Sequence, residues 1–371
     1  MVVRNEGEKK LKVAIVAGSR PELIKLAPVY WEMRESTDFE PLLCFTGQHG
    51  NLGAQMADAL GLRAHTSYDL TRVTNSLSEP TARVLAKIDS FLREVGAHFI
   101  VLLGDSSSTF TSALAGFRAG IPVTHVERGL RTGHVKHRFP EEGLRRMVTV
   151  ISDLHFAPTA QARNNLLLEG VGDDVTHVVG NTVVDAMNKM MPPGGLPQSG
   201  RPSVVVTAHG SENWGMEIAV LSDLVMALIR ERPNVDVHWV VHLNPAVAGE
   251  IQRKLGKVPN IRLHPPLDYV QFLSLLTSES VVITDSWWVQ EEATSLGIRT
   301  LIARERTERV EGIAAGTADL LHPKRSIRLG QVLEAIDEVA EGPPRETSGV
   351  YGDGHTASRI FKILVSRFGN S

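Results

Sequence analysis

Acidic side chains end two predicted strands and begin a helix in the N-terminal half of the chain. Asp105 follows the apolar run 99–103, and Glu127 follows the run 122–126. Continuous apolar runs are typical of parallel strands buried on both faces. Glu141 comes directly after a proline, which suits the first turn of a helix. Because ligands of parallel sheets bind outside the carboxyl ends of the strands, we expect these three carboxylates to form a site at one edge. For Asp105 alone, a helix cap is the alternative.

Two arginines near predicted strand ends are candidates for binding an anion. The segment 18–22 turns the apolar run 13–17 into a helix, and Arg20 lies at the helix N-terminus, where backbone N–H groups favour negative charge. The same segment would also serve as an ordinary capped turn. Arg131 lies close in sequence to the acidic group. We therefore include both arginines among the candidate substrate- or phosphate-binding residues.

Histidines follow predicted strands in both halves of the chain. His209 comes after a buried strand, in the position that Asp105 has in the first half, and we favour a functional over a structural role for it. Gln48 and His49 form a polar loop after a predicted strand, and His242 ends another. These loops are expected to face a ligand for the same reason as the carboxylates.

Two adjacent tryptophans, Trp287 and Trp288, begin a predicted helix after the apolar run 281–284. Successive residues of a helix do not face the same way, so we expect one ring to be packed in the interior. The other could offer a flat face on which a base or a sugar stacks.

Composition limits the class of protein. A length of 371 residues predicts two domains, and the net charge of -3 gives no field for nucleic acid or a membrane surface. Cys44 is the only cysteine, which excludes a disulfide framework and a cysteine metal site. The N-terminus is polar, without the core of a signal peptide, and no apolar run approaches the ~20 residues of a membrane helix. We expect a cytoplasmic protein without nucleic-acid or membrane partners.

Strands alternate with helices on both sides of a turn-rich segment, which predicts two doubly wound parallel sheets. Residues 190–203, rich in proline and glycine, are the expected linker. The first α/β domain would span residues 1–189 and carry the carboxylates, and the second would span 204–354. Clefts between domains are favoured ligand sites.

Short motifs in a fixed order resemble those of the non-hydrolysing UDP-N-acetylglucosamine 2-epimerase family over almost the whole chain. Each motif is weak alone, whereas the ordered set is specific. In the first half the motifs are Gly-Ser-Arg-Pro-Glu at 18–22, Thr-Gly-Gln-His at 46–49, Gly-Asp at 104–105, His-Val-Glu at 125–127, Gly-Leu-Arg-Thr-Gly at 129–133 and Phe-Pro-Glu-Glu at 139–142. Later motifs are Gly-Asn-Thr-Val at 180–183, His-Leu-Asn-Pro at 242–245, Thr-Asp-Ser at 284–286, Gln-Glu-Glu-Ala at 290–293, Thr-Glu-Arg at 307–309 and Tyr-Gly-Asp-Gly at 351–354.

The resemblance implies the GT-B architecture, with two Rossmann-like domains around a cleft and residues 355–371 as a helix that crosses back to the first domain. It also implies a homodimer and a reaction without a metal or redox cofactor. In that reaction the nucleotide diphosphate leaves C1 of the sugar as a proton leaves C2, and both then return. The residues that match the family's catalytic positions are Asp105, Glu127, Glu141 and His209. Our candidates for binding the substrate or its phosphates are Arg20, Gln48, His49, Arg131, His242, Ser286, Trp287, Trp288, Glu292 and Arg309.

The sequence departs from the family pattern mainly where the diphosphate is expected. Residues 210–211 are Gly-Ser where two arginines are usual, and residues 287–288 are Trp-Trp where two glycines are usual. Arginines pair with phosphates, and glycines let the backbone approach them closely. Arg128 replaces a small residue, and Leu144 replaces an asparagine. We expect that the part of the site that binds the sugar is retained, and that the part that binds the nucleotide differs from the family pattern.

Three functions stay open on these grounds. The first is an epimerase-like enzyme that cleaves the C1–O bond of a nucleotide-diphosphate or phosphorylated sugar and acts at C1 and C2. The second is a glycosyltransferase that joins the activated sugar to another acceptor, such as a nucleobase in nucleoside natural-product biosynthesis. The third is a sugar-nucleotide sensor without catalysis, against which the retained carboxylates and His209 argue.

Overall fold

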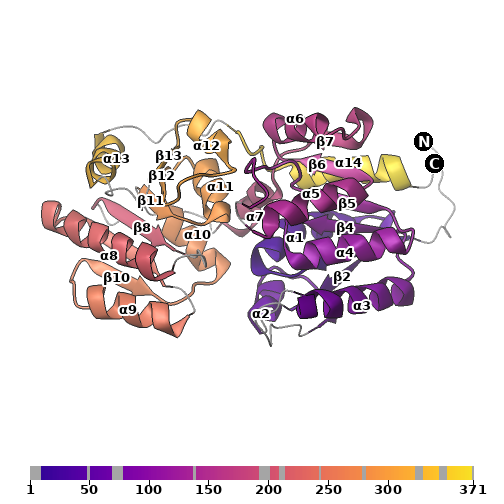
Figure 1. Cartoon of the computed structure of the whole chain (residues 1–371), viewed down its shortest axis with the longest axis horizontal. Helices are drawn as coiled ribbons and strands as arrows, with labels where there is room; N and C mark the ends of the chain where they lie inside the picture. Colours follow the sequence, from indigo (N-terminus) through magenta and orange to yellow (C-terminus); the bar gives the residue numbers. More distant parts are fainter. Residues whose placement is uncertain are drawn as a thin grey trace. The chain divides into compact units, whose positions relative to one another are not determined.

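The protein is described by a computed structural model that covers residues 10–47, 51–68, 78–136, 139–191, 201–208, 214–241, 244–277, 281–321, 329–341 and 349–369. The chain divides into two compact units. Unit 1 comprises Met1–Ala186 and Tyr351–Ser371, and unit 2 comprises Met187–Val350 (Figure 1). Most of the linker expected at 190–203 lies outside the described residues.

Unit 1 is built on a seven-stranded sheet with the order β3-β2-β1-β4-β5-β6-β7, and its strand pairs are parallel. The strands are β1 (Leu11–Ala17), β2 (Phe39–Phe45), β3 (Ala64–Ser67), β4 (Phe99–Leu103), β5 (Val123–Val126), β6 (Leu154–Ala157) and β7 (Thr176–Val178). The helices are α1 (Arg20–Glu35), α2 (Asn51–Ala59), α3 (Ser78–Val95), α4 (Ser107–Arg118), α5 (Glu141–Ile151), α6 (Ala160–Leu168), η1 (Asp173–Val175), α7 (Thr182–Met190) and α14 (Thr356–Phe368). The predicted parallel sheet is confirmed.

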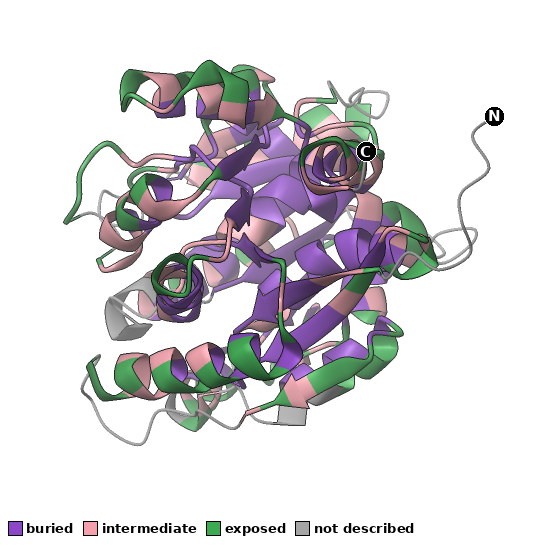
Figure 2. Cartoon of the chain, turned by 90° about the vertical axis from the view of Figure 1, so that its right-hand side faces the viewer, coloured by how far each residue is buried: buried purple, intermediate pink, exposed green. Residues whose placement is uncertain are grey.

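Apolar runs become the buried centre of this sheet. Every residue of β4 and β5 is buried, while the helices that cover the sheet turn exposed residues outward (Figure 2). The edge strand β3 was not predicted, because its short sequence Ala-His-Thr-Ser is mostly exposed and gives no apolar signal.

The C-terminal helix α14 packs within unit 1, although it lies far from that unit in the sequence (Figure 1). The Phe368 ring stacks on Phe99 at the start of β4, with ring centroids 4.5 Å apart. The Phe361 ring meets Phe39 edge-on at 5.6 Å. Aromatic pairs at these separations add to the stabilisation that burial provides. Helix α14 is therefore an integral part of unit 1.

Unit 2 holds a six-stranded parallel sheet with the order β10-β9-β8-β11-β12-β13. Its strands are β8 (Ser203–Thr207), β9 (Asp236–Val240), β10 (Ile261–His264), β11 (Val281–Thr284), β12 (Arg299–Ile302) and β13 (Ala318–Leu320). Its helices are α8 (Trp214–Glu231), α9 (Pro245–Leu255), α10 (Tyr269–Thr277), α11 (Trp287–Ser295), α12 (Val310–Ala314) and α13 (Leu329–Glu341).

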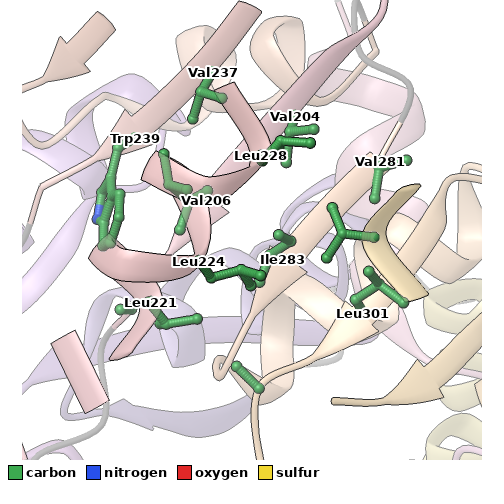
Figure 3. Packing of buried hydrophobic residues seen from close by; sticks show 14 of the residues in the cluster. Val204, Val206, Leu221, Leu224, Leu228, Val237, Trp239, Val281, Ile283 and Leu301 are labelled. Atoms are coloured by element: carbon green, nitrogen blue, oxygen red, sulfur yellow. The ribbon is translucent and has the colours of Figure 1, made fainter. Parts of the chain in front are cut away.

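Both faces of the unit 2 sheet are buried, which explains its continuous apolar strands. Alternate strand residues, such as Val206 and Ile283, share one core with Leu224 of α8 (Figure 3). The strand residues between them, such as Val282, face the other side of the sheet and join a second core with Leu276 of α10. In the described part of the chain, no helix is long and apolar enough to cross a membrane.

Candidate active site

Asp105 lies in the loop between β4 and α4. Gly104 turns the chain there with φ of 87°, a conformation that glycine adopts without steric penalty. The cap of α4 is Ser106, whose hydroxyl accepts a hydrogen bond from the backbone N–H of Thr109 at 3.2 Å. The Asp105 carboxylate instead forms an ion pair with Arg145 of α5. The capping alternative for Asp105 is therefore wrong, and its carboxylate is directed at a cation.

Glu127 follows β5 in an unusual conformation. Its φ is 60°, which is sparsely populated for residues other than glycine and is a form of strain often found at functional sites. The carboxylate accepts a hydrogen bond from Nζ of the buried Lys25 at 2.6 Å and one from Nδ2 of Asn181 at 3.3 Å. Lys25 comes from α1, and Asn181 precedes α7. Elements far apart in the sequence thus hold one buried carboxylate.

Glu141 is the first residue of α5 and is partly buried. Its neighbour Glu142 is fully buried and organises the start of the helix. The Glu142 carboxylate accepts hydrogen bonds from the backbone N–H of Thr132 at 3.1 Å and from Nε of Arg146 at 3.0 Å, and it pairs with Arg145 at 3.4 Å. Glu142 therefore fixes both the preceding loop and the arginine that meets Asp105.

The three predicted carboxylates lie at one end of the unit 1 sheet. Strands β4 and β5 are neighbours, with Leu103 opposite Val126, so Asp105 and Glu127 emerge side by side at their carboxyl ends. Helix α5, which begins at Glu141, joins this group through the Arg145 ion pair with Asp105. The structure places these residues in one region, while their catalytic roles remain predictions.

Arg131 and Arg20 occupy different environments. The Arg131 guanidinium makes two hydrogen bonds to the carboxylate of Glu169, at 2.7 and 2.6 Å, and a third to Thr149 at 3.1 Å. A phosphate would use the same bidentate geometry, so Glu169 competes for this group. Arg20 is the first residue of α1, at the helix N-terminus where an anion is favoured.

Glu22 is a buried carboxylate that was not singled out from the sequence. It accepts hydrogen bonds from the backbone N–H groups of Gly18 at 2.6 Å and Ser19 at 3.2 Å, as in a capping box. Burial raises the pKa of Glu22 to about 7, and the negative charge of Asp105 adds to this effect, while the two backbone hydrogen bonds oppose it. A carboxylate beside Asp105 therefore changes charge near neutral pH.

His125 supports the loop that carries Asp105. Its Nε2 lies 2.8 Å from the carbonyl oxygen of Gly104, and because a carbonyl can only accept, this nitrogen carries the proton. Burial lowers the pKa of His125 well below its usual value, and the charge of Arg128 lowers it further. The imidazole is therefore neutral at physiological pH and acts as a fixed donor.

The two tryptophans of unit 2 have different surroundings. Ser286 occupies the N-cap position of α11 without a capping hydrogen bond from its side chain. The Trp287 ring that follows lies against the Arg309 guanidinium, 4.7 Å from the ring centroid. The Trp288 ring packs on Phe272, with centroids 5.3 Å apart, and joins the core beneath α10. Both tryptophans are half-buried, and of the two only Trp288 belongs to the surroundings of this core. Stacking of a ligand on Trp287 stays a prediction.

Arg309 and Glu292 are both buried in unit 2. Arg309 pairs with Glu291 at 2.9 Å and with Glu308, so two carboxylates already balance its charge. Glu292 lies against Tyr269, whose pKa is raised well above its usual value by burial and then by the charge of Glu292. Glu291 and Glu292 both belong to α11, and contact of Arg309 or Glu292 with a ligand stays a prediction.

Four predicted site residues cannot be placed. Gln48, His49, His209 and His242 lie outside the described residues. Among the residues that are described, no group of three or more His, Cys, Asp or Glu side chains could hold a metal ion.

Sequence reasoning did not identify the cations that hold the carboxylates. Lys25 does leave a signal, since it is a lone charge in the apolar stretch 23–27 of a helix, where burial requires a partner. Arg145 follows Glu142 by three residues, the spacing of neighbours on a helix, but nothing in the sequence connects it to Asp105.

Comparisons with known proteins show the family to which the chain belongs. The family model described as UDP-N-acetylglucosamine 2-epimerase matches residues 31–365. Over 369 residues the chain is 36% identical to the UDP-N-acetylglucosamine 2-epimerase of Bacillus subtilis, and the match covers 97% of each chain.

Solved structures are similar along the whole chain. The crystal structure of UDP-GlcNAc 2-epimerase from Neisseria meningitidis bound to UDP-GlcNAc is 32% identical, with a TM-score of 0.87 that covers 96% of this chain and 100% of that one. The structure of the Methanocaldococcus jannaschii enzyme in complex with UDP-GlcNAc and UDP is 27% identical, with a TM-score of 0.85 over 96% of this chain and 100% of that one. With the two parallel sheets, these likenesses confirm the predicted GT-B fold class.

Proposed function

Because the chain belongs to the UDP-N-acetylglucosamine 2-epimerase family, a family of isomerases, we propose that it acts at C1 and C2 of a nucleotide-diphosphate sugar. UDP-GlcNAc is the first substrate to test, since it is bound in the structures of two relatives. The observation that carries the proposal is the pairing of both strand-end carboxylates with buried cations, Asp105 with Arg145 and Glu127 with Lys25.

The proposed reaction is an elimination followed by the reverse addition. A carboxylate takes the proton from C2, the C–H electron pair forms the C1–C2 double bond, and the C1–O bond breaks as the diphosphate leaves. Return of a proton to the other face of C2 and re-addition of the diphosphate complete the epimerisation. Asp105, Glu127 and Glu141 are the proposed acids and bases. For Asp105 and Glu127, neighbouring cations favour the ionised form that a base requires. His209 is proposed to steady the departing phosphate.

Turnover of UDP-GlcNAc by single variants tests these roles. Asp105→Asn, Glu127→Gln and Glu141→Gln should each lower kcat by a factor on the order of a hundred or more. Glu79→Gln is the matched control, since Glu79 is an exposed residue in a surface pair with Arg83. A variant that folds normally and turns over normally would remove its residue from the mechanism.

The second candidate is glycosyl transfer to a flat acceptor such as a nucleobase. The favouring observation is Trp287, whose ring rests on Arg309, itself held by two buried glutamates. A ring held in this way loses little freedom when a base stacks on its other side, a contact worth ~1–3 kcal/mol on aromatic platforms. Adenine or uracil should then quench tryptophan fluorescence, and Trp287→Gly should weaken this binding more than the core variant Trp288→Leu. Quenching that both variants retain would oppose this candidate.

We also propose a homodimer in the cytoplasm. Three large apolar side chains are exposed on the neighbouring helices α4 and α5: Phe117 at 58%, Met147 at 46% and Val150 at 83%. Exposed apolar groups of this kind often mark a protein–protein interface. Sedimentation velocity should give a dimer that Phe117→Ser with Val150→Ser converts to a monomer; a monomeric wild type would contradict the proposal.

A further inference from the structure

Arg128 is a buried cation to which the proposed reaction assigns no role. It follows Glu127 directly and is 1% exposed. Its backbone N–H donates to the carbonyl of Phe156 at 2.9 Å, which fixes the residue between the ends of β5 and β6. Burying a guanidinium is strongly unfavourable unless nearby charges and hydrogen bonds compensate for lost water. Arg128 is therefore a buried cation next to Glu127, whose backbone is strained, and we expect it to have a specific role in this site.

The hydrogen bonds of Arg128 lead to the partner of Asp105. Nη2 of Arg128 donates to the hydroxyl of Thr149, which also accepts from Nη2 of Arg131 at 3.1 Å. The same hydroxyl donates to the backbone carbonyl of Arg145 at 2.9 Å. Thr149 thus connects two guanidinium groups to the turn of α5 that carries Arg145.

Arg145 in turn meets the proposed base. Its Nη2 forms the ion pair with Asp105, while Nη1 donates to the carbonyl of Leu130 at 3.0 Å and pairs with Glu142 at 3.4 Å. The guanidinium is 4% exposed, so its position is set by these contacts. A displacement of the α5 turn would therefore move the cation that faces Asp105.

Charges around Arg128 are balanced between the two signs. Burial, and then repulsion by the charges of Arg131 and Arg145, lower the pKa of Arg128 well below its usual value, whereas the charges of Asp105 and Glu169 oppose this shift. Two histidines complete the surroundings, and both are neutral. Burial and then the charge of Arg128 lower the pKa of His155 to about 4 and that of His125 well below its usual value. On the α1 side, Glu22 adds a negative charge near Asp105 only as the pH rises through about 7, because burial raises its pKa to about 7.

We propose that Arg128 is a positioning residue of the Asp105 site, which holds the Arg145 turn of α5 through Thr149 and adds a positive charge that keeps the Asp105 carboxylate ionised. It does not touch the substrate, because its side chain is buried. That this carboxylate is a catalytic base rests on the proposed function above.

The test separates charge from hydrogen bonding with three variants. Arg128→Met removes both, Arg128→Lys keeps the charge, and Thr149→Val keeps the charge but removes the connecting hydroxyl. Arg118→Met, an exposed arginine on α4, is the control. For each protein kcat and KM are measured from pH 5 to 9, and the ionisation of Asp105 is followed by carbon-13 NMR of labelled aspartate, with Asp105→Asn used to assign the signal.

Arg128→Met should move the acid limb of kcat/KM, and the midpoint of the Asp105 signal, upward by about one pH unit, since an opposite charge nearby favours the ionised carboxylate. In Arg128→Lys both midpoints should stay at their wild-type values. Thr149→Val should lower kcat more than it changes KM. Should Arg128→Met fail to fold, Arg128→Gln, which also removes the charge, takes its place in the same comparison.

Unchanged midpoints in Arg128→Met, with only a lower Tm, would reduce Arg128 to a structural residue and overturn the proposal. The proposal would also be overturned if the midpoint of Asp105 in Arg128→Lys rose as far as it does in Arg128→Met. If the wild type turns over no sugar nucleotide, the NMR midpoints still show whether Arg128 affects the ionisation of Asp105. Failure of the proposed function can thus be distinguished from failure of the proposal for Arg128.

Discussion

The buried pair between Lys25 and Glu127 gives a sharp test of how the site is held. Lys25→Met should destabilise unit 1 strongly, because it leaves a carboxylate buried without its cation. The two side chains are 1% and 3% exposed, and Nζ lies 2.6 Å from Oε1. Removing one partner of such a pair costs about 3–5 kcal/mol. For a folding unit of roughly 200 residues, this corresponds to a fall in Tm of roughly 10 °C.

A double-variant cycle separates the lost pair from lost packing. Lys25→Met combined with Glu127→Gln leaves no uncompensated charge, so the double variant should be more stable than Lys25→Met alone. Urea unfolding followed by circular dichroism gives the free energies, and amide exchange by mass spectrometry assigns the change to unit 1. Lys362→Met, an exposed lysine of α14, is the control. Free energies of the two single variants that simply add, within ~0.5 kcal/mol, would refute the reasoning.

Three further predictions concern the surroundings of the site. The pKa of Glu22 is raised from its ordinary 4.5 to about 7 in the folded protein, which implies a stability that is present below pH 4.5 and lost as the pH rises through 7. Glu22→Gln should therefore flatten the dependence of the unfolding free energy on pH in this window, as measured by urea unfolding. An unchanged slope would contradict the assignment. Gly129→Ala should unfold unit 1 or lower its Tm sharply, since φ is +90° and the added Cβ would lie 1.9 Å from the carbonyl oxygen of Ala162. In the control Gly120→Ala, φ is +69° and the Cβ would meet open space, so only the strain of the backbone conformation should lower the Tm. Equal Tm values for the two variants would contradict this prediction. Trp288→Ala should destabilise unit 2 by about 2–4 kcal/mol through the lost contact with Phe272, measured by urea unfolding, and a value near zero would show that the ring is not part of the core.

The fold was largely predictable because both sheets are buried on two faces. Under that condition a strand appears in the sequence as a continuous apolar run, as in β4 and β11, and the turn after it marks the ligand edge. Short strands with less burial leave a weaker signal. The exposed edge strand β3 and the three-residue β13 were not found for this reason.

The candidate site was predictable in its carboxylates but not in their partners. Asp105 and Glu127 follow strands, so topology alone brings them together. Lys25 lies 102 residues before Glu127, and no spacing rule can connect them. The burial of Arg128 and the raised pKa of Glu22 likewise depend on which helices cover the strand ends, which becomes known only when the chain is folded.

Incubation with UDP-GlcNAc in heavy water tests the central claim most directly. If a carboxylate of unit 1 removes the proton from C2, mass spectrometry and NMR should find one deuterium at C2 in the recovered UDP-sugar, together with the C2 epimer. The label should fall by a factor on the order of a hundred in Asp105→Asn and Glu127→Gln. A folded wild type that binds UDP-GlcNAc and returns it without deuterium at C2 would contradict the account.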